Sequence, residues 1–254
     1  MVPPKAARPM EPVLPSVDVR ERGRPRDGVP QTMNRRLFMQ LLVFRAPVGT
    51  SAAATAEELA AKVGGAGVPG VVYEDVNDPR SIGLLSMSED PADFVKKVRP
   101  LFAEGTLAAL ELRPELTMFG RSYSSGFEDD LEFWLLTRPR EAALNDTCDW
   151  AVWYPLRRTG AFNRLDGREK GEIIHEHALI GRAYGEQDLV HDIRLACHGL
   201  DAADNEFILG LVGKELHPLS HVVQTMRGTR QTSEYIAQMG PFFVGHVAHR
   251  ITAG

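Results

Sequence analysis

A short internal repeat constrains the fold of this chain more than any other feature of its sequence. The stretch GLLSMSEDPADFVKKV at residues 83–98 aligns without gaps with GLVGKELHPLSHVVQT at residues 210–225, so that Gly83 matches Gly210. Each copy reads as a strand, a short turn and a helix that begins near a proline. The offset of 127 residues is half of the 254-residue chain, which indicates two similar halves.

The order of the predicted elements is similar in the two halves. In the first half the apolar pattern predicts strands at 37–46, 68–76 and 81–88, and helices at 51–63 and 91–103. In the second half it predicts strands at 150–158, 192–200 and 206–215, and helices at 167–186 and 217–236. Strands and helices in this order are typical of β-α-β-β-α-β, or ferredoxin-like, modules.

We therefore expect an α+β fold with two ferredoxin-like modules and antiparallel sheets, of the dimeric α/β-barrel type. The first module covers residues 33–145 and the second covers residues 146–254. Helices pack on one face of each sheet, so the other face remains apolar and needs a partner. Packing of the two sheets against each other, or a ligand enclosed beside them, would cover it.

Residues 1–32 differ in composition from the rest of the chain. They are rich in proline and arginine, and they lack the apolar segment of a secretory signal peptide. So few side chains suited to a core predict a disordered N-terminal extension.

Composition also narrows the class of protein. A net charge of −5 argues against a nucleic-acid partner, and no apolar run approaches the ~20 residues that span a bilayer. Cys148 and Cys197 are the only cysteines, so the chain contains neither a disulfide framework nor a CxxC metal motif. This usage fits a reducing cytoplasm.

The helix predicted at 167–186 contains two histidines around a glutamate, in the sequence IIHEHALIGRAY. Residues two apart on a helix diverge by about 200°, so His175 and His177 cannot bind one ion together. The HExxH spacing of zinc hydrolases is also absent. His177 falls in the apolar stripe that begins at Ile173, whereas His175 falls on the charged side. Periodicity leaves two interpretations of His177 open: a buried histidine bonded to backbone, or an axial haem ligand.

Several motifs resemble the chlorite dismutase-like superfamily, and most closely its coproheme decarboxylase, or HemQ-type, branch. The motifs are EHALIGRAY, the preceding Tyr154-Pro155, the GLD turn at 199–201, Met226-Arg227 and the ending RGTRQTSEYIAQMGPFFVG. The resemblance covers roughly residues 34–250. It independently implies paired ferredoxin-like domains.

The resemblance implies a role for five residues. His177 occupies the position of the proximal histidine that binds haem iron, and Tyr154 that of a redox-active tyrosine. Arg158, Arg227 and Thr232 match positions that contact the porphyrin propionates. Arginine and hydroxyl donors suit a carboxylate in a partly apolar cleft. From sequence alone, each residue also allows a structural interpretation: a core tyrosine, a solvated strand end, a helix cap or a helix-surface threonine.

The far side of the porphyrin is where this chain departs from the family pattern. Chlorite-degrading members carry an arginine there and many decarboxylases a glutamine, but alignment back from Gly199 places Asp192 at this position. Arg194 shares a strand face with Asp192. Arg194 therefore leaves chlorite dismutation open as an alternative activity. His191 or Asp192 could alternatively act as a base that deprotonates peroxide.

The resemblance implies a cytoplasmic enzyme that uses hydrogen peroxide to convert two propionates of iron coproporphyrin to vinyl groups, giving haem b. It also implies a homopentamer and a transient contact with the ferrochelatase that delivers the substrate. A non-catalytic protein for haem binding or transfer and a structural oligomer without haem are further interpretations.

Overall fold

The first half of the chain folds as a β-α-β-β unit that a later strand completes. In the computed structural model, which describes residues 14–252, its elements are β3 (Phe38–Arg45), α1 (Ala52–Gly65), β4 (Gly70–Asp75), β5 (Ser81–Ser88) and β7 (Met118–Ser122). Helix α1 begins after Ser51, whose hydroxyl accepts a hydrogen bond from the backbone of Ala54. The predicted strands and the first predicted helix of this half are confirmed.

The second half repeats the arrangement. Its elements are β8 (Trp150–Arg158), α4 (Gly167–Glu186), β9 (His191–Ala196), β10 (Phe207–Gly213), α5 (Leu216–Met226) and β12 (Phe243–Ile251). Sequence analysis had not located β7 or β12, which provide the fourth strand of each half. The repeated stretches lie in equivalent places, since Gly83 is in β5 and Gly210 is in β10.

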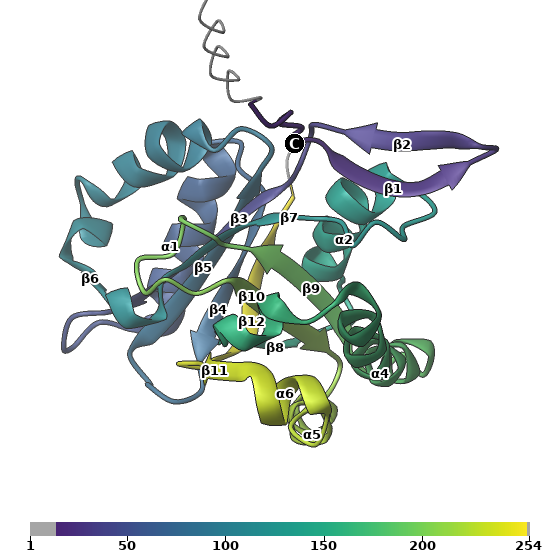
Figure 1. The fold of residues 1–254 in the computed structure, drawn as a ribbon. Helices are drawn as coiled ribbons and strands as arrows, with labels where there is room; N and C mark the ends of the chain where they lie inside the picture. Colours follow the sequence, from purple (N-terminus) through teal and green to yellow (C-terminus); the bar gives the residue numbers. More distant parts are fainter. Residues whose placement is uncertain (1–13, 253–254) are drawn as a thin grey trace, which may run out of the picture.

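The strands of both halves form one closed antiparallel ring. The order β8-β10-β9-β7-β3-β5-β4-β12 returns to β8, and every pairing among the described residues is antiparallel. Two seams join the halves: a long one between β4 and β12 and a short one between β7 and β9. The expected fold class is therefore confirmed, with the two sheets joined edge to edge into a barrel (Figure 1).

Inward-facing side chains fill the barrel, and helices cover its outside. The largest fully buried side chains include Trp153 and Phe243, and both belong to the interior cluster. A second cluster lies beneath α1 and a third between the second-half strands and α5. A barrel of this size encloses side chains alone, so the barrel interior is a core and a ligand has to bind outside it.

Two predicted helices are divided in the structure. The segment expected at 91–103 forms a π-helical turn, Phe94–Val98, followed by a 3₁₀ turn, Arg99–Phe102, because Pro100 cannot continue an α-helix. The segment expected at 217–236 ends at Met226 and resumes as α6 (Arg230–Tyr235), with Gly228 and the capping residue Thr229 between them. The remaining short elements are β6 (Glu111–Leu112), 3₁₀ turns at Thr106–Ala109 and Pro114–Leu116, a π-helical turn at Phe133–Thr137, α2 (Arg138–Leu144), α3 (Gly160–Arg164) and β11 (Ile236–Met239).

The expected disorder of residues 1–32 is wrong for residues 21–32, whereas residues 1–13 lie outside the described part. Strands β1 (Glu21–Arg26) and β2 (Val29–Met33) form a hairpin. Asp27 and Gly28 both have positive φ at its turn. Asp-Gly is a strong signal for such turns, and the disorder prediction overlooked it.

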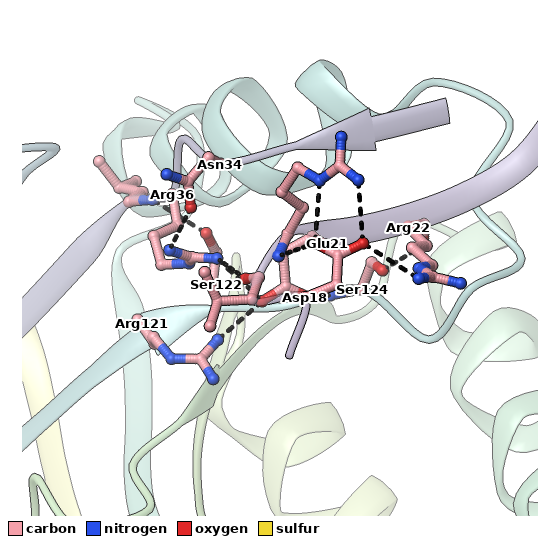
Figure 2. A network of polar contacts seen from close by, with 11 residues as sticks. Asp18, Glu21, Arg22, Asn34, Arg36, Arg121, Ser122 and Ser124 are labelled. Atoms are coloured by element: carbon pink, nitrogen blue, oxygen red, sulfur yellow. Dashed lines mark hydrogen bonds and ion pairs between the residues drawn. The ribbon is translucent and has the colours of Figure 1, made fainter. Parts of the chain in front are cut away.

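Polar contacts, rather than a core of its own, hold this hairpin against the barrel. Glu21 forms ion pairs with Arg121 at 2.8 Å and with Arg36 at 3.5 Å (Figure 2). The backbone N–H of Arg24 donates to the carbonyl of Glu128 at 2.9 Å. The argument from composition predicted disorder here because it considers only how few apolar residues the segment contains. It takes no account of pairing between charges that are far apart in the sequence.

A glycine in the repeated stretch leads to a stability prediction. A Cβ at Gly210 would collide with the buried indole ring of Trp153. We expect Gly210→Ala to lower the free energy of unfolding by roughly 1–3 kcal/mol, because the tightly packed interior cannot accept the extra carbon. Chemical denaturation measures the change.

Gly171→Ala is the matched control for Gly210→Ala. Gly171 is exposed on α4, and a Cβ there would meet nothing within 4 Å. Alanine should raise helix stability at this position by roughly 0.5–1 kcal/mol. If Gly210→Ala were as stable as the parent protein, close packing of Trp153 on β10 would be the wrong explanation for this glycine.

Within residues 14–252, the model contains no helix with the length and apolar character needed to cross a membrane.

Candidate functional site

Helix α4 turns one face toward the body of the protein. Asp166 caps its first turn by accepting hydrogen bonds from the backbone of Arg168 and Glu169. Ile173 is buried and His177 is half-buried, whereas His175 is exposed. The apolar stripe predicted from helical periodicity is confirmed, with His177 on the inner face. In Figure 1, α4 lies beside α5 and α6, which it also contacts.

The neighbours of His177 favour an imidazole that can bind a metal. Burial lowers the pKa of His177, and the charge of Arg194 lowers it further. The neutral form, which metals bind, is thereby favoured. Nδ1 lies 3.5 Å from the hydroxyl oxygen of Thr229, whose own hydrogen is directed to the carbonyl of Met226 at 2.7 Å. Thr229 therefore acts as an acceptor toward His177, and Nε2 keeps its lone pair.

Thr229 was not among the residues chosen from sequence, although its position carried a signal. It follows a glycine and precedes a short helix, a pattern typical of an N-cap, and it caps α6 by accepting from Thr232. Sequence alone could predict the cap. It could not predict that the capping hydroxyl also faces a histidine 52 residues away.

Thr229 leads to a prediction on the histidine tautomer. We expect Thr229→Val to raise the fraction of His177 that carries its proton on Nε2, because the acceptor that favours Nδ1–H is removed. Thr229→Ser should keep the parent tautomer. Long-range ¹H–¹⁵N correlation spectra of the protein without porphyrin distinguish the two forms. An unchanged spectrum in Thr229→Val would show that this hydroxyl does not orient the ring.

Tyr154 lies on the outer face of the barrel, on the side that the second-half helices cover. In the strand register, Tyr154 of β8 lies opposite Leu209 of β10, and Leu209 lies opposite Arg194 of β9. The three side chains therefore form a row across the sheet. The Tyr154 ring is buried and stacks on Phe242 with centroids 4.6 Å apart. Burial raises the pKa of Tyr154 to about 12, which keeps the phenol protonated at neutral pH.

Asp192 belongs to an ion cluster on the same face of the sheet. One carboxylate oxygen accepts from Arg138 of α2 at 2.5 Å, and the other pairs with Nε of Arg194 at 3.1 Å. Burial alone would raise the pKa of Asp192, but the charges of Arg138 and Arg194 hold it below its ordinary value. An ionised carboxylate with both oxygens engaged is poorly suited to act as a peroxide base.

His191 lies outside this cluster. Successive residues of a strand point to opposite faces, and the ring of His191 pairs with Asp188 at 2.9 Å at the end of the preceding turn. The proposed use of His191 or Asp192 as a base therefore finds no support in the geometry.

The three proposed propionate contacts have different surroundings. Arg158 lies over the rings of Phe162 and Phe207 and donates to Glu206 at 3.1 Å, so a structural partner already engages part of its guanidinium. Arg227 caps α5 and is exposed, and no ion pair to it occurs among residues 14–252. The preceding residue, Met226, packs in the same apolar cluster as Tyr154, so Arg227 borders the region that contains the phenol.

Thr232 lies on α6 next to Thr229, with their hydroxyl oxygens 3.2 Å apart. The structure thus brings Thr232 toward His177, whereas Tyr154, Asp192 and Arg194 lie together on the sheet. Ile180, which follows His177 by about one turn of α4, packs in the same apolar cluster as Tyr154 and Leu209, so the two sets of residues border one region.

Comparison with protein families identifies the family of this chain. The family model described as chlorite dismutase matches residues 83–248, more than half of the 254 residues. The chain belongs to the chlorite dismutase family. The match includes every site residue predicted from the sequence, as well as Arg138 and Thr229.

Solved structures of other proteins share the fold of this chain. A haem-binding protein from Thermus thermophilus is 18% identical, with a TM-score of 0.65 over 85% of this chain and 92% of that chain. Chlorite dismutase from Candidatus Nitrospira defluvii in complex with imidazole is 13% identical, with the same TM-score and coverage. A search of curated proteins finds no match.

Proposed function

We propose that this member of the chlorite dismutase family is a haem enzyme that decarboxylates iron coproporphyrin with hydrogen peroxide. The observation that carries the proposal is the position of Tyr154. Its phenol is buried on the sheet face that the second-half helices cover and is held in the protonated form, and the residue before Arg227, Met226, packs in the same apolar cluster. A substrate carboxylate beside Arg227 would lie close to a phenol that can give up a hydrogen atom.

The residues of the region fit a haem. His177 supplies a neutral imidazole whose Nε2 is free to bind iron. Partly buried apolar side chains, among them Ile180, Leu209 and Met226, belong to the cluster between sheet and helices and would contact a flat apolar ring. Arg194 and Arg227 are exposed cations that would hold its carboxylates.

The proposed reaction balances for each propionate. One propionate, one hydrogen peroxide and one proton give a vinyl group, carbon dioxide and two waters. When bound, the haem supplies the oxidising power that peroxide brings to the site. Tyr154 loses its phenolic hydrogen atom and then recovers one from the β-carbon of the propionate. A further one-electron oxidation breaks the bond to the carboxylate, which leaves as carbon dioxide.

Arg227 would hold the carboxylate in register with the Tyr154 hydroxyl during these steps, and His177 would hold the iron. Product masses after mixing purified protein with ferric coproporphyrin and peroxide test the proposal. Each conversion removes one carbon dioxide and the accompanying hydrogens. The carbon dioxide lost should therefore amount to about 44 mass units after the first conversion and about 88 after the second. A substrate mass that stays unchanged would refute it.

Chlorite dismutation is the second candidate, and the exposed guanidinium of Arg194 favours it. Arg194 lies in the same sheet row as Tyr154, and its strand β9 contacts α4, the helix that carries His177. Oxygen evolution from chlorite that is lost in Arg194→Ala and kept in Tyr154→Phe would assign this activity instead.

Haem binding without catalysis is the third candidate. The relative from Thermus thermophilus is described as a haem-binding protein. Reversible binding through His177, with neither decarboxylation nor oxygen evolution, would identify this function. The cytoplasmic location, the homopentamer and the ferrochelatase contact stay predictions from the resemblance.

A further inference from the structure

Two histidines lie one turn apart on the exposed side of helix α5. His217 and His221 are four residues apart in this helix, so both side chains lie on one face of it. Both residues are exposed, and their ring centroids lie 5.9 Å apart. An imidazole that binds through one nitrogen places its ring centre about 3.2 Å from the ion, so two rings on one ion are at most about 6.4 Å apart. The spacing of the two rings therefore allows them to bind one ion together.

A chain of hydrogen bonds between α4 and α5 sets the tautomer of His221. Thr225 donates its hydroxyl hydrogen to the backbone carbonyl of His221 at 2.9 Å. Thr225 therefore accepts from the hydroxyl of Tyr184 of α4, which lies 3.0 Å away. That bond uses the only hydrogen of the Tyr184 hydroxyl, so this hydroxyl accepts from Nδ1 of His221. The lone pair of His221 is thereby left on Nε2, where a metal can bind it.

Nothing in the described part of the chain occupies the nitrogens that would bind an ion. Among residues 14–252, neither Nε2 of His221 nor either ring nitrogen of His217 has a hydrogen-bond partner. Histidines that bind a metal usually donate their other ring N–H to an acceptor that fixes the ring. The Tyr184 hydroxyl is such an acceptor for His221, and the Tyr184 side chain packs in the apolar cluster between sheet and helices. The orientation of the His221 ring is therefore set before any ion binds.

The internal repeat shows that this part of the fold does not require the two histidines. In the alignment of residues 83–98 with 210–225, Asp90 and Phe94 occupy the positions of His217 and His221. Phe94 is buried in the first half, whereas His221 is exposed in the second. A strand, a turn and a helical segment thus form in the first copy with neither histidine. Folding of the repeated element does not explain the pair.

We propose that His217 and His221 form a binding site for a divalent transition-metal ion, separate from the region around His177. Imidazole nitrogens suit Zn²⁺, Ni²⁺ and Cu²⁺, and the affinity should be highest for Cu²⁺. The two histidines supply two ligands and water supplies the others, so the ion exchanges with solvent. Tyr184 is a positioning residue, because it contacts His221 and not the ion. The site does not depend on the proposed function, since it needs no porphyrin.

Titration of the porphyrin-free protein with Ni²⁺, followed by calorimetry, tests the site. We expect saturable binding in the parent protein and an affinity at least about tenfold lower in His217→Gln and in His221→Gln, because each substitution removes one of two ligands. The control is His175→Gln, which removes an exposed histidine that has no second histidine one turn away on α4. Its Ni²⁺ affinity should equal that of the parent protein. Equal affinity in the parent protein and His217→Gln would overturn the proposal.

The tautomer of His221 tests the positioning role of Tyr184. Tyr184→Phe removes the acceptor for Nδ1–H, so the fraction of His221 with its proton on Nε2 should rise and Ni²⁺ affinity should fall about tenfold. Thr225→Val should act in the same direction, because Tyr184 can then donate its hydrogen to Nδ1, whereas Thr225→Ser should keep the parent tautomer. Long-range ¹H–¹⁵N correlation spectra without metal measure the tautomer. An unchanged tautomer and Ni²⁺ affinity in Tyr184→Phe would overturn the positioning role.

Discussion

His177→Ala is expected to abolish axial ligation of the haem iron. His177 is half-buried on the inner face of α4, in a setting that keeps its imidazole neutral. Under the proposed ligation, removing the side chain would leave the iron without its protein ligand, and we expect haem affinity to fall by about 100-fold or more. The Soret band of the ferric protein should shift toward that of weakly bound haem. Titration of the protein with haem, followed by absorbance, measures both effects.

His175→Ala is the control that distinguishes ligation from general disturbance of the helix. His175 is exposed on the same helix two residues away, so its loss removes an imidazole without changing the inner face. The haem affinity and the absorbance spectrum of His175→Ala should match those of the parent protein. Added imidazole should restore the parent spectrum to His177→Ala by occupying the vacated volume. An unchanged spectrum in His177→Ala would support the alternative of a buried structural histidine.

Tyr154→Phe is expected to slow decarboxylation by at least about 100-fold, or about 2.7 kcal/mol in the barrier. Phenylalanine keeps the aromatic ring that stacks on Phe242 but cannot lose a phenolic hydrogen atom. Porphyrin affinity and thermal stability should therefore stay near those of the parent protein. Product masses sampled over time, with ferric coproporphyrin and peroxide, measure the rate.

Tyr235→Phe provides the comparison for this experiment. Tyr235 packs against Phe162 in a separate cluster, so loss of its hydroxyl should leave the rate unchanged. A rate in Tyr154→Phe equal to that of the parent protein would exclude Tyr154 as the hydrogen donor. Tyr123 would then be the next candidate, because its ring lies 5.4 Å from that of Phe207, on which Arg158 stacks.

Prediction from sequence succeeded where a local pattern reflects a single buried face. The predicted bounds of α4 agree with the structure, in which a capping residue marks the start of the helix. His177 was selected because α4 buries only one stripe of its side chains. The internal repeat indicated two equivalent halves before any element was placed. These features depend on residues a few positions apart, so periodicity and capping are sufficient to identify them.

Prediction failed where partners come from distant segments. The hairpin of residues 21–33 depends on an ion pair between Glu21 and Arg121, which composition does not register. The expected helix at 217–236 divides at Gly228, and the cap that divides it also faces His177. Asp192 was considered as a peroxide base because the sequence does not show its partner Arg138, which lies 54 residues away and in the other half.

The sequence by itself determined the two-fold α+β plan, the strand that carries Tyr154 and the helix face that carries His177. These follow from hydrophobic periodicity, which every segment carries within itself. Only the tertiary structure decided that the barrel closes through β4 with β12 and β7 with β9, that Thr229 accepts from His177, and that Arg138 engages Asp192 beside Arg194. Electrostatic and hydrogen-bond partners depend on distances in space, and the folded chain alone sets these distances.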